Sequence, residues 1–233
     1  ITIAKGDMLN MALIKFSGVS KQFERNDETF WATRDIHLEV EKGEFLTVIG
    51  PSGCGKSTVL NMCAGIMTAD EGSILFDGKP VKKVNTKVGY MTQKDNLLPW
   101  RTVMKNVELG LEIHGISRSE REKRCRRYIE MVGLDGFEKQ YPQELSGGMR
   151  KRVSLAQLLA YNPETLLLDE PFGALDAQLR LIMQDKLLEI WKETFPEVVG
   201  LAEKNNLYLA LEGWPGPAPV YPTLGATPEV LRY

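Results

Sequence analysis

The chain has 233 residues, of which 43% are hydrophobic and 26% charged, with a formal net charge of −2. This length suits one α/β domain with a subdomain, and the near-neutral charge without a basic block argues against a nucleic-acid partner. No apolar run approaches the roughly 18 residues that span a bilayer, no secretory signal pattern opens the sequence, and three cysteines without metal-like spacing favour a reducing, cytosolic setting.

The N-terminal part is predicted to be β-rich. Residues before Met11 are expected to be an extension outside the folded domain. Residues 12–16 and 36–40 alternate apolar and polar side chains, which predicts two half-buried strands. Residues 41–43 form the predicted turn into an apolar, β-rich run at residues 45–49, which indicates a buried strand.

A glycine-rich motif follows this strand and matches the phosphate-loop template G-x-x-x-x-G-K-[S/T] at every fixed position. Glycines remove side chains, so that successive backbone N–H groups can point at phosphate oxygens. Lys56 supplies a cation for the phosphates, and the Ser57 hydroxyl can bind Mg²⁺. Thr58 opens a predicted helix whose positive N-terminal end faces the anion. The loop consists of Gly50, Pro51, Ser52, Gly53, Cys54, Gly55, Lys56 and Ser57.

Three aromatic residues lie between the first two predicted strands, namely Phe23, Phe30 and Trp31. One of them could stack on a nucleotide base, because a purine offers a flat π-face. Phe23 is our candidate. The alternative is that all three aromatic side chains pack into the core.

Two further strands are predicted after the helix. Residues 73–76 run into Asp77 and Gly78, a strong hairpin-turn signal. Residues 87–91 form another buried strand, and Gln93 follows it at the edge where such sheets present ligand contacts. A lone glutamine is also typical of a solvated loop.

The middle of the chain, residues 96–157, is predicted to be helical and more charged. Ser117 and Glu120 fit a capping box. The charged run after them is typical of a solvated helix face, and Gly133 ends that helix. Trp100 lies in a Leu-Pro-Trp loop, where it either anchors a partner or packs.

Residues 145–149 open the next predicted helix with a Leu-Ser-Gly-Gly-Met motif. Ser146 can cap that helix, while Gly147 and Gly148 allow an anion to approach the backbone closely. The alternative is an ordinary helix-entry loop.

An apolar run at residues 165–168 predicts a strand that leads into two adjacent carboxylates. Asp169 is a candidate for holding Mg²⁺, and Glu170 is placed to polarise an attacking water. The alternative is a surface acidic turn. Asp176 begins a predicted helix that extends to about Thr194.

Taken in order, these motifs resemble those of the ATP-binding subunit of ABC transporters over residues 11–194. Met149 in the signature resembles the nitrate, sulfonate and taurine importer branch, and so does the segment around Trp100. The matching motifs are Walker A at residues 50–57, the Q-loop glutamine Gln93, the signature at residues 145–149, Walker B ending at Asp169 and Glu170, and the D-loop at residues 173–176.

The resemblance implies a P-loop NTPase core of the RecA-like α/β type, with an N-terminal antiparallel β part and a helical signature subdomain near residues 96–157. It implies ATP and Mg²⁺ as ligands and Glu170 as the catalytic residue. It also implies metal contacts from Ser57, Gln93 and Asp169. The implied nucleotide contacts are Phe23, the Walker A residues with Thr58, Gln93, Asp176, and Ser146, Gly147 and Gly148 of a second copy.

The implied function is to power an importer for small anions such as nitrate, sulfonates or taurine by hydrolysing ATP. The implied partners are a second ATP-binding subunit, transmembrane permease subunits and, indirectly, a solute-binding protein. The implied location is peripheral, on the cytoplasmic side of the inner membrane. One alternative is a soluble ABC ATPase of DNA repair or translation, and another is an ATP-binding module with impaired hydrolysis.

Residues 195–233 depart from the family pattern, which continues with a core strand and a switch histidine. The sequence holds only His37 and His114, and neither follows Walker B. Five prolines from Pro215 to Pro228 make the end of this tail unfit for central strands, and residues 207–211 are its strand-like run. We therefore expect an incomplete core and weak ATPase activity with measurable Mg-ATP affinity. A shifted reading frame and a natural truncated paralogue are the two hypotheses for its origin.

Overall fold

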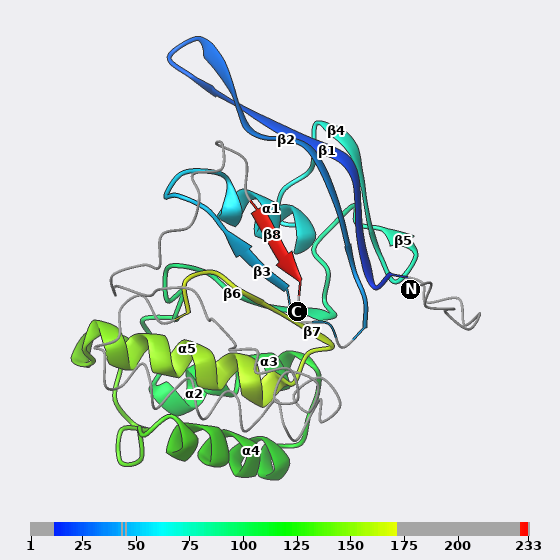
Figure 1. The fold of residues 1–233 in the computed structure, drawn as a ribbon. Coiled ribbons are helices and arrows are strands. Elements are labelled where there is room, and N and C mark those ends of the chain that lie inside the picture. The colour runs from blue at the N-terminus through cyan, green and yellow to red at the C-terminus, as the bar shows by residue number, and fades with distance from the viewer. Residues whose placement is uncertain (1–11, 43, 45, 172–228, 233) are drawn as a thin grey trace. The chain divides into compact units, whose positions relative to one another are not determined.

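A computed structural model describes residues 12–42, 44, 46–171 and 229–232 of the chain (Figure 1). These residues belong to two compact units. The first contains the described residues up to Asn85 together with those from Glu229 to Arg232. The second contains the described residues from Thr86 to Pro171. In this part of the chain, no helix combines the length and apolar character that crossing a bilayer requires.

The first unit is built on an antiparallel sheet with strand order β2-β1-β4-β5. Its buried face carries apolar side chains from three strands: Ile14, Phe16, Val19, Leu38, Val40, Ile74 and Phe76. The strands are β1 (Ile14–Arg25), β2 (Glu28–Val40), β4 (Glu71–Phe76) and β5 (Lys79–Pro80). The sheet confirms the predicted N-terminal antiparallel β part, and the β4–β5 connection confirms the hairpin turn at residues 77–78.

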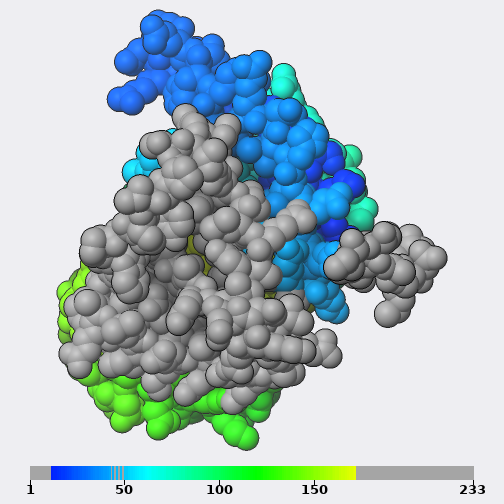
Figure 2. Space-filling view, in the orientation of Figure 1, coloured from blue at the N-terminus to red at the C-terminus, as the bar shows by residue number. Residues whose placement is uncertain are grey.

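The hairpin of β1 and β2 is longer than the sequence predicts. The two strands pair as far as Arg25 opposite Glu28, so only Asn26 and Asp27 form the turn. Both turn residues have positive φ, 53° and 62°, which suits the right-handed twist of a two-residue hairpin. The tip of this hairpin, drawn in blue, is exposed (Figure 2).

Two elements of the first unit flank the phosphate loop. They are β3 (Leu46–Ile49) and α1 (Lys56–Cys63), in agreement with the predicted strand and helix. The partner of β3 is β8 (Glu229–Arg232), which pairs with it antiparallel along its whole length (Figure 1). The tail is predicted to be unfit for central strands, and β8, which pairs with β3 alone among the described residues, was not identified from the sequence. This strand can form because it begins directly after Pro228, so that its backbone N–H groups remain available for pairing.

The second unit is mainly helical, as predicted for residues 96–157. Its helices are α2 (Val103–Val107), α3 (Leu109–Ile113), α4 (Arg118–Met131), the short 3₁₀ helix η1 (Pro142–Glu144) and α5 (Gly147–Tyr161). Helix α5 contacts α2, α3 and α4, and most of its side chains from Lys151 onward are buried. The Ser117 hydroxyl accepts a hydrogen bond from the Glu120 amide, which confirms the predicted helix start.

A parallel strand pair completes the second unit. Strands β6 (Val88–Met91) and β7 (Thr165–Leu168) run side by side with Met91 opposite Leu168. Strand β6 also contacts α5, as expected for a parallel pair covered by a helix. Because both strands end at the same edge, the residues that follow them are brought together.

Candidate nucleotide-binding site

The phosphate loop connects β3 to α1 in the conformation that its glycines require. Gly55 has φ 98° and is the N-cap of α1. A Cβ atom at Gly55 would lie 2.3 Å from the carbonyl oxygen of Ala32, so a larger residue would displace β2. Gly53 has φ 82°, and a Cβ atom there would meet nothing within 4 Å. The loop is therefore packed on one side and open on the other.

The side chain of Lys56 folds back over this loop. Its Nζ atom donates hydrogen bonds to the carbonyl oxygens of Gly50 at 2.7 Å and Pro51 at 3.1 Å. No side chain caps the N-terminus of α1, and Ser57 in its first turn is exposed. Amides at a helix start carry a partial positive charge. A cation, backbone donors and an exposed hydroxyl thus fit a phosphate chain with its Mg²⁺.

The three N-terminal aromatic residues do not share one environment. Phe30 is 47% exposed and Trp31 is 36% exposed, so the alternative in which all three pack into the core is wrong. The ring of Phe23 is half-buried and lies 6.1 Å from that of Phe30. Arg34 lies over the Trp31 ring at 5.4 Å. Phe23 remains a prediction as the base-stacking residue.

In the second unit, the structure brings Gln93 and the acid pair together. The amide nitrogen of the Gln93 side chain donates to Glu170 Oε2 at 2.9 Å, although the two residues are 77 positions apart. The backbone N–H of Asp169 donates to the carbonyl of Met91 at 2.9 Å, and the Asp169 side chain is buried. Glu170 has φ 49°, a left-handed conformation that is uncommon for this residue type and that often marks functional sites.

Electrostatic effects are visible beside this pair. Burial raises the pKa of Tyr90 to about 12, and the negative charge of Asp169 adds to this rise. Lys151 is buried, and desolvation lowers the pKa of its ammonium group, while Asp95, Asp169 and Glu170 act in the opposite direction. The sequence analysis did not identify Lys151. The only available signal was a basic residue one turn after the signature glycines.

The signature motif has the predicted helix-start geometry. The Ser146 hydroxyl accepts from the Met149 amide at 3.2 Å, which makes Ser146 the N-cap of α5. Gly147 is exposed and Gly148 is half-buried, so the helix start is open to a ligand. Arg150 donates to the carbonyl of Leu145 at 2.7 Å and holds the preceding turn.

The remaining predicted site residues divide between the two units or lie outside the described chain. The phosphate loop, Thr58 and Phe23 belong to the first unit, whereas Gln93, the acid pair and the signature belong to the second. Asp176 and the predicted helix after it lie outside the described residues. In the described ranges, no group of three or more His, Cys, Asp or Glu residues is arranged to hold a metal ion.

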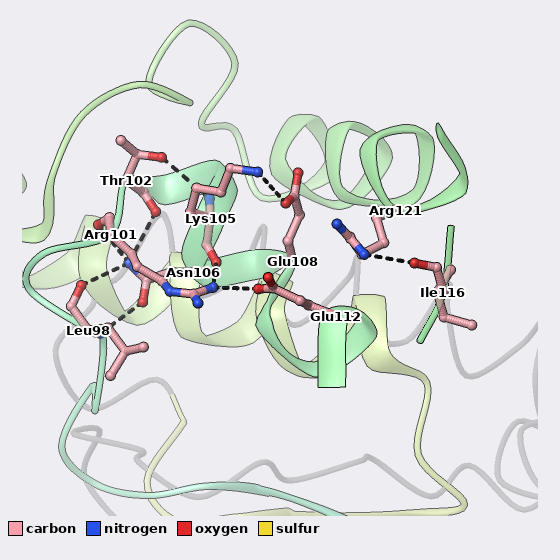
Figure 3. A network of polar contacts seen from close by, with 9 residues as sticks. All are labelled: Leu98, Arg101, Thr102, Lys105, Asn106, Glu108, Glu112, Ile116 and Arg121. Carbon is pink, nitrogen blue, oxygen red and sulfur yellow. Dashed lines mark hydrogen bonds and ion pairs between the residues drawn. The ribbon is translucent and has the colours of Figure 1, made fainter. Parts of the chain in front are cut away.

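Asn106 organises the Leu-Pro-Trp loop of the second unit (Figure 3). Its side chain is completely buried, and its amide group bonds to the backbone of Leu98, Arg101 and Thr102. Trp100, inside this loop, is 71% exposed, so the alternative in which it packs is wrong.

Ion pairs surround this loop. Arg101 binds Glu112 at 2.7 Å and holds the pKa of that carboxyl below its usual range (Figure 3). Lys105 pairs with the buried carboxylate of Glu108 at 2.7 Å.

Known proteins resemble this chain in sequence and fold. The family model for ABC transporters matches residues 33–173. An uncharacterized ABC transporter ATP-binding protein of Methanocaldococcus jannaschii is 49% identical over 82% of this chain and 71% of its own length. The taurine import ATP-binding protein TauB of Pseudomonas aeruginosa is 45% identical over 79% and 70%. The aliphatic sulfonates import ATP-binding protein SsuB of Bacillus cereus is 45% identical over 77% and 70%.

Solved structures agree with these relatives. The dimeric structure of a bacterial ABC transporter cassette matches with a TM-score of 0.73 and 33% identity, covering 78% of this chain and 84% of that one. A second dimeric structure of the same cassette, in a post-hydrolysis state bound to ADP and phosphate, matches with a TM-score of 0.71 and 32% identity, over the same shares of the two chains. The predicted P-loop NTPase fold is thereby confirmed. The chain belongs to the ABC transporter family, as a nucleotide-binding ATPase subunit.

Proposed function

We propose that this subunit powers an importer of small sulfonated anions, of the taurine or aliphatic sulfonate type. The observation that carries the proposal is the open phosphate loop between β3 and α1, in a chain 45% identical to taurine and sulfonate import subunits. The exposed Leu-Pro-Trp loop supports an attachment to further subunits. Nitrate, which was also expected as a solute, is not named by these relatives.

The proposed division of roles follows the geometry. The phosphate loop and Lys56 would hold the triphosphate, with Thr58 in the same turn and Phe23 against the base. Glu170 would orient the attacking water and accept its proton. Its hydrogen bond to Gln93 at 2.9 Å supports this role, because it fixes the direction of the carboxylate.

The proposed metal is Mg²⁺, with Ser57, Gln93 and Asp169 as the residues that would hold it directly or through water. Hydroxyl, amide and carboxylate oxygens are the donors that Mg²⁺ prefers. When bound, Mg²⁺ would neutralise charge on the β- and γ-phosphates. Asp169 is buried at the end of β7, which supports a fixed carboxylate ligand.

A second copy of the chain is the proposed partner at the nucleotide. Ser146, Gly147 and Gly148 present an open helix start that could take a phosphate of the other copy's ATP. Asp176 belongs to the same proposed contact by resemblance. A permease is the proposed partner at Trp100, which would place the subunit peripherally on the cytoplasmic side of the membrane. A solute-binding protein would act through the permease.

Titration with Mg-ATP tests the nucleotide site. Wild-type protein should bind Mg-ATP, and Lys56→Ala should raise the dissociation constant by roughly tenfold or more, because a charge-assisted contact contributes about 1.5–3 kcal/mol. The matched control is Lys82→Ala, which removes an exposed lysine of the same unit and should leave the dissociation constant of Mg-ATP unchanged. Equal affinity of Lys56→Ala and wild type would refute the site.

Transport assays test the solute and the alternative function. The chain assembled with its permease in vesicles should support ATP-dependent uptake of taurine or an alkanesulfonate. Binding of Mg-ATP without turnover in that assembly would instead identify a module with impaired hydrolysis. A chain that never associates with a permease would support a soluble ATPase.

A further inference from the structure

We propose that Lys151 is a positioning residue that fastens the backbone of Gln93 to helix α5 and thereby holds Glu170 in place. The Nζ atom of Lys151 donates to the carbonyl oxygen of Thr92 at 2.9 Å and also to that of Gln93. Both carbonyls lie just beyond the end of β6, past Met91 and Leu168, the last residue pair of the β6–β7 ladder. The inference rests on the proposed role of Glu170.

Two neighbours of Lys151 on α5 hold the same segment. The Ser154 hydroxyl donates to the carbonyl of Asp95 at 2.7 Å, and Arg150 Nε pairs with the Asp95 carboxylate at 2.7 Å. Positions 150, 151 and 154 lie on one side of a helix. Side chains of α5 therefore hold residues 92–95 through hydrogen bonds to Thr92, Gln93 and Asp95.

The burial of Lys151 indicates that its hydrogen bonds to residues 92 and 93 are more than surface contacts. Lys151 is only 6% exposed. Removing an ammonium group from water costs free energy unless the group is hydrogen-bonded. Two carbonyl oxygens meet that requirement. Because the Gln93 side chain in turn bonds Glu170 at 2.9 Å, a chain of contacts runs from the signature helix to the proposed base.

The consequence is a separation of binding from turnover. Lys151 is not among the residues proposed to contact the nucleotide or its Mg²⁺, and the phosphate loop itself does not depend on it. Losing Lys151 would free the Gln93 backbone, so that the Gln93–Glu170 hydrogen bond would form only part of the time. Hydrolysis should then fall while affinity persists, as for an interaction used only in the transition state.

The test compares two cations of α5 that each hold two backbone carbonyls. Lys151→Met removes the hydrogen bonds to the carbonyls of residues 92 and 93 and keeps an apolar side chain of similar length. Arg152→Met is the matched control, because Arg152 donates to the carbonyls of Val132 and Gly133 at 2.9 and 3.0 Å, at the end of α4. Lys94 is an exposed lysine within residues 92–95, so trypsin cleavage after it reports on local opening of this segment.

We expect Lys151→Met to lower kcat about tenfold or more, with the Mg-ATP dissociation constant within about twofold of wild type. Cleavage after Lys94 should accelerate by about the same factor, while cleavage after Lys82 should not change. Arg152→Met should leave kcat and Lys94 cleavage within about twofold. Ser154→Ala is a milder variant that a helix tolerates well, and it should accelerate Lys94 cleavage by about threefold.

Wild-type kcat and wild-type Lys94 cleavage in Lys151→Met would overturn the inference. So would equal losses of kcat in Lys151→Met and Arg152→Met, since these would mark a general effect on stability. If the wild-type chain binds Mg-ATP but does not turn it over, the proposed function fails, and the cleavage rates after Lys94 still decide whether Lys151 holds the segment.

Discussion

Replacing Asn106 with aspartate should destabilise the second unit strongly at neutral pH. The Asn106 side chain is 0% exposed. Its Nδ2 atom donates to the carbonyl oxygens of Leu98, Arg101 and Thr102 at 3.2, 2.9 and 3.1 Å, and its Oδ1 atom accepts the Leu98 N–H at 2.8 Å. In Asn106→Asp, a carboxylate would face three carbonyl oxygens and keep only one donor.

The magnitude follows from the protonation of the new carboxyl group. A fully buried carboxyl with so few donors has its pKa raised by about 3 units, which corresponds to about 4 kcal/mol at pH 7. Because this folded-state pKa lies above the unfolded value of about 3.9, the added deficit is absent below about pH 4. It grows by about 1.4 kcal/mol per pH unit up to the folded-state pKa and is constant above it. A deficit of about 1–2 kcal/mol for lost hydrogen bonds should persist at low pH.

Urea unfolding between about pH 4.5 and 8 measures this dependence. The matched control is Asn96→Asp, which makes the same chemical change on an exposed side chain whose amide nitrogen donates to the Thr92 hydroxyl at 2.6 Å. Asn96 has φ 41°, a conformation that aspartate also adopts readily. The control should stay within about 0.5 kcal/mol of wild type. Equal and pH-independent deficits for the two variants would refute the assignment of Asn106 as the residue that holds the loop.

Three further outcomes are expected. A maleimide at pH 8 should modify Cys54 alone until the protein unfolds, because Cys63 and Cys125 are buried and burial raises the pKa of each to about 12. Mg-ATP at about 100 times its dissociation constant should slow that modification about 100-fold, and no protection would contradict binding at the loop. Glu170→Gln should retain Mg-ATP binding while kcat falls about 10²- to 10⁴-fold, measured by phosphate release. Trp100→Ala should leave the free energy of unfolding within about 0.5 kcal/mol, since the side chain is 71% exposed, yet weaken co-purification with the permease about fivefold or more.

Local signals were enough to predict the elements that carry the motifs. The phosphate-loop motif places glycines where the backbone turns from a strand into a helix. Gly55 has φ 98°, as this reasoning predicts. Ser117 and Ser146 cap their helices through hydroxyl groups three residues before the amides that they accept from. Each of these features depends on residues fewer than ten positions apart.

Features that depend on distant residues were not predictable in the same way. The bond between Gln93 and Glu170 exists because β6 and β7 are parallel neighbours, and the sequence alone does not state which strands pair. The pairing of β8 with β3 was missed for a related reason. The prolines of the tail dominated its interpretation, although four residues beyond the last proline are enough for a short strand.

The segment between β6 and α2 shows why such contacts matter for function. The backbone carbonyls of a segment outside the sheet have no strand ladder to join and need hydrogen-bond donors elsewhere. Here the carbonyls near its two ends accept hydrogen bonds from side chains outside the segment, those of Lys151, Ser154 and Asn106. Gln93 and Trp100 are therefore held by side chains that belong to no nucleotide-binding motif. A sequence that keeps Gln93 and Trp100 but loses these three donors should keep its motifs and still lose the geometry that makes them useful.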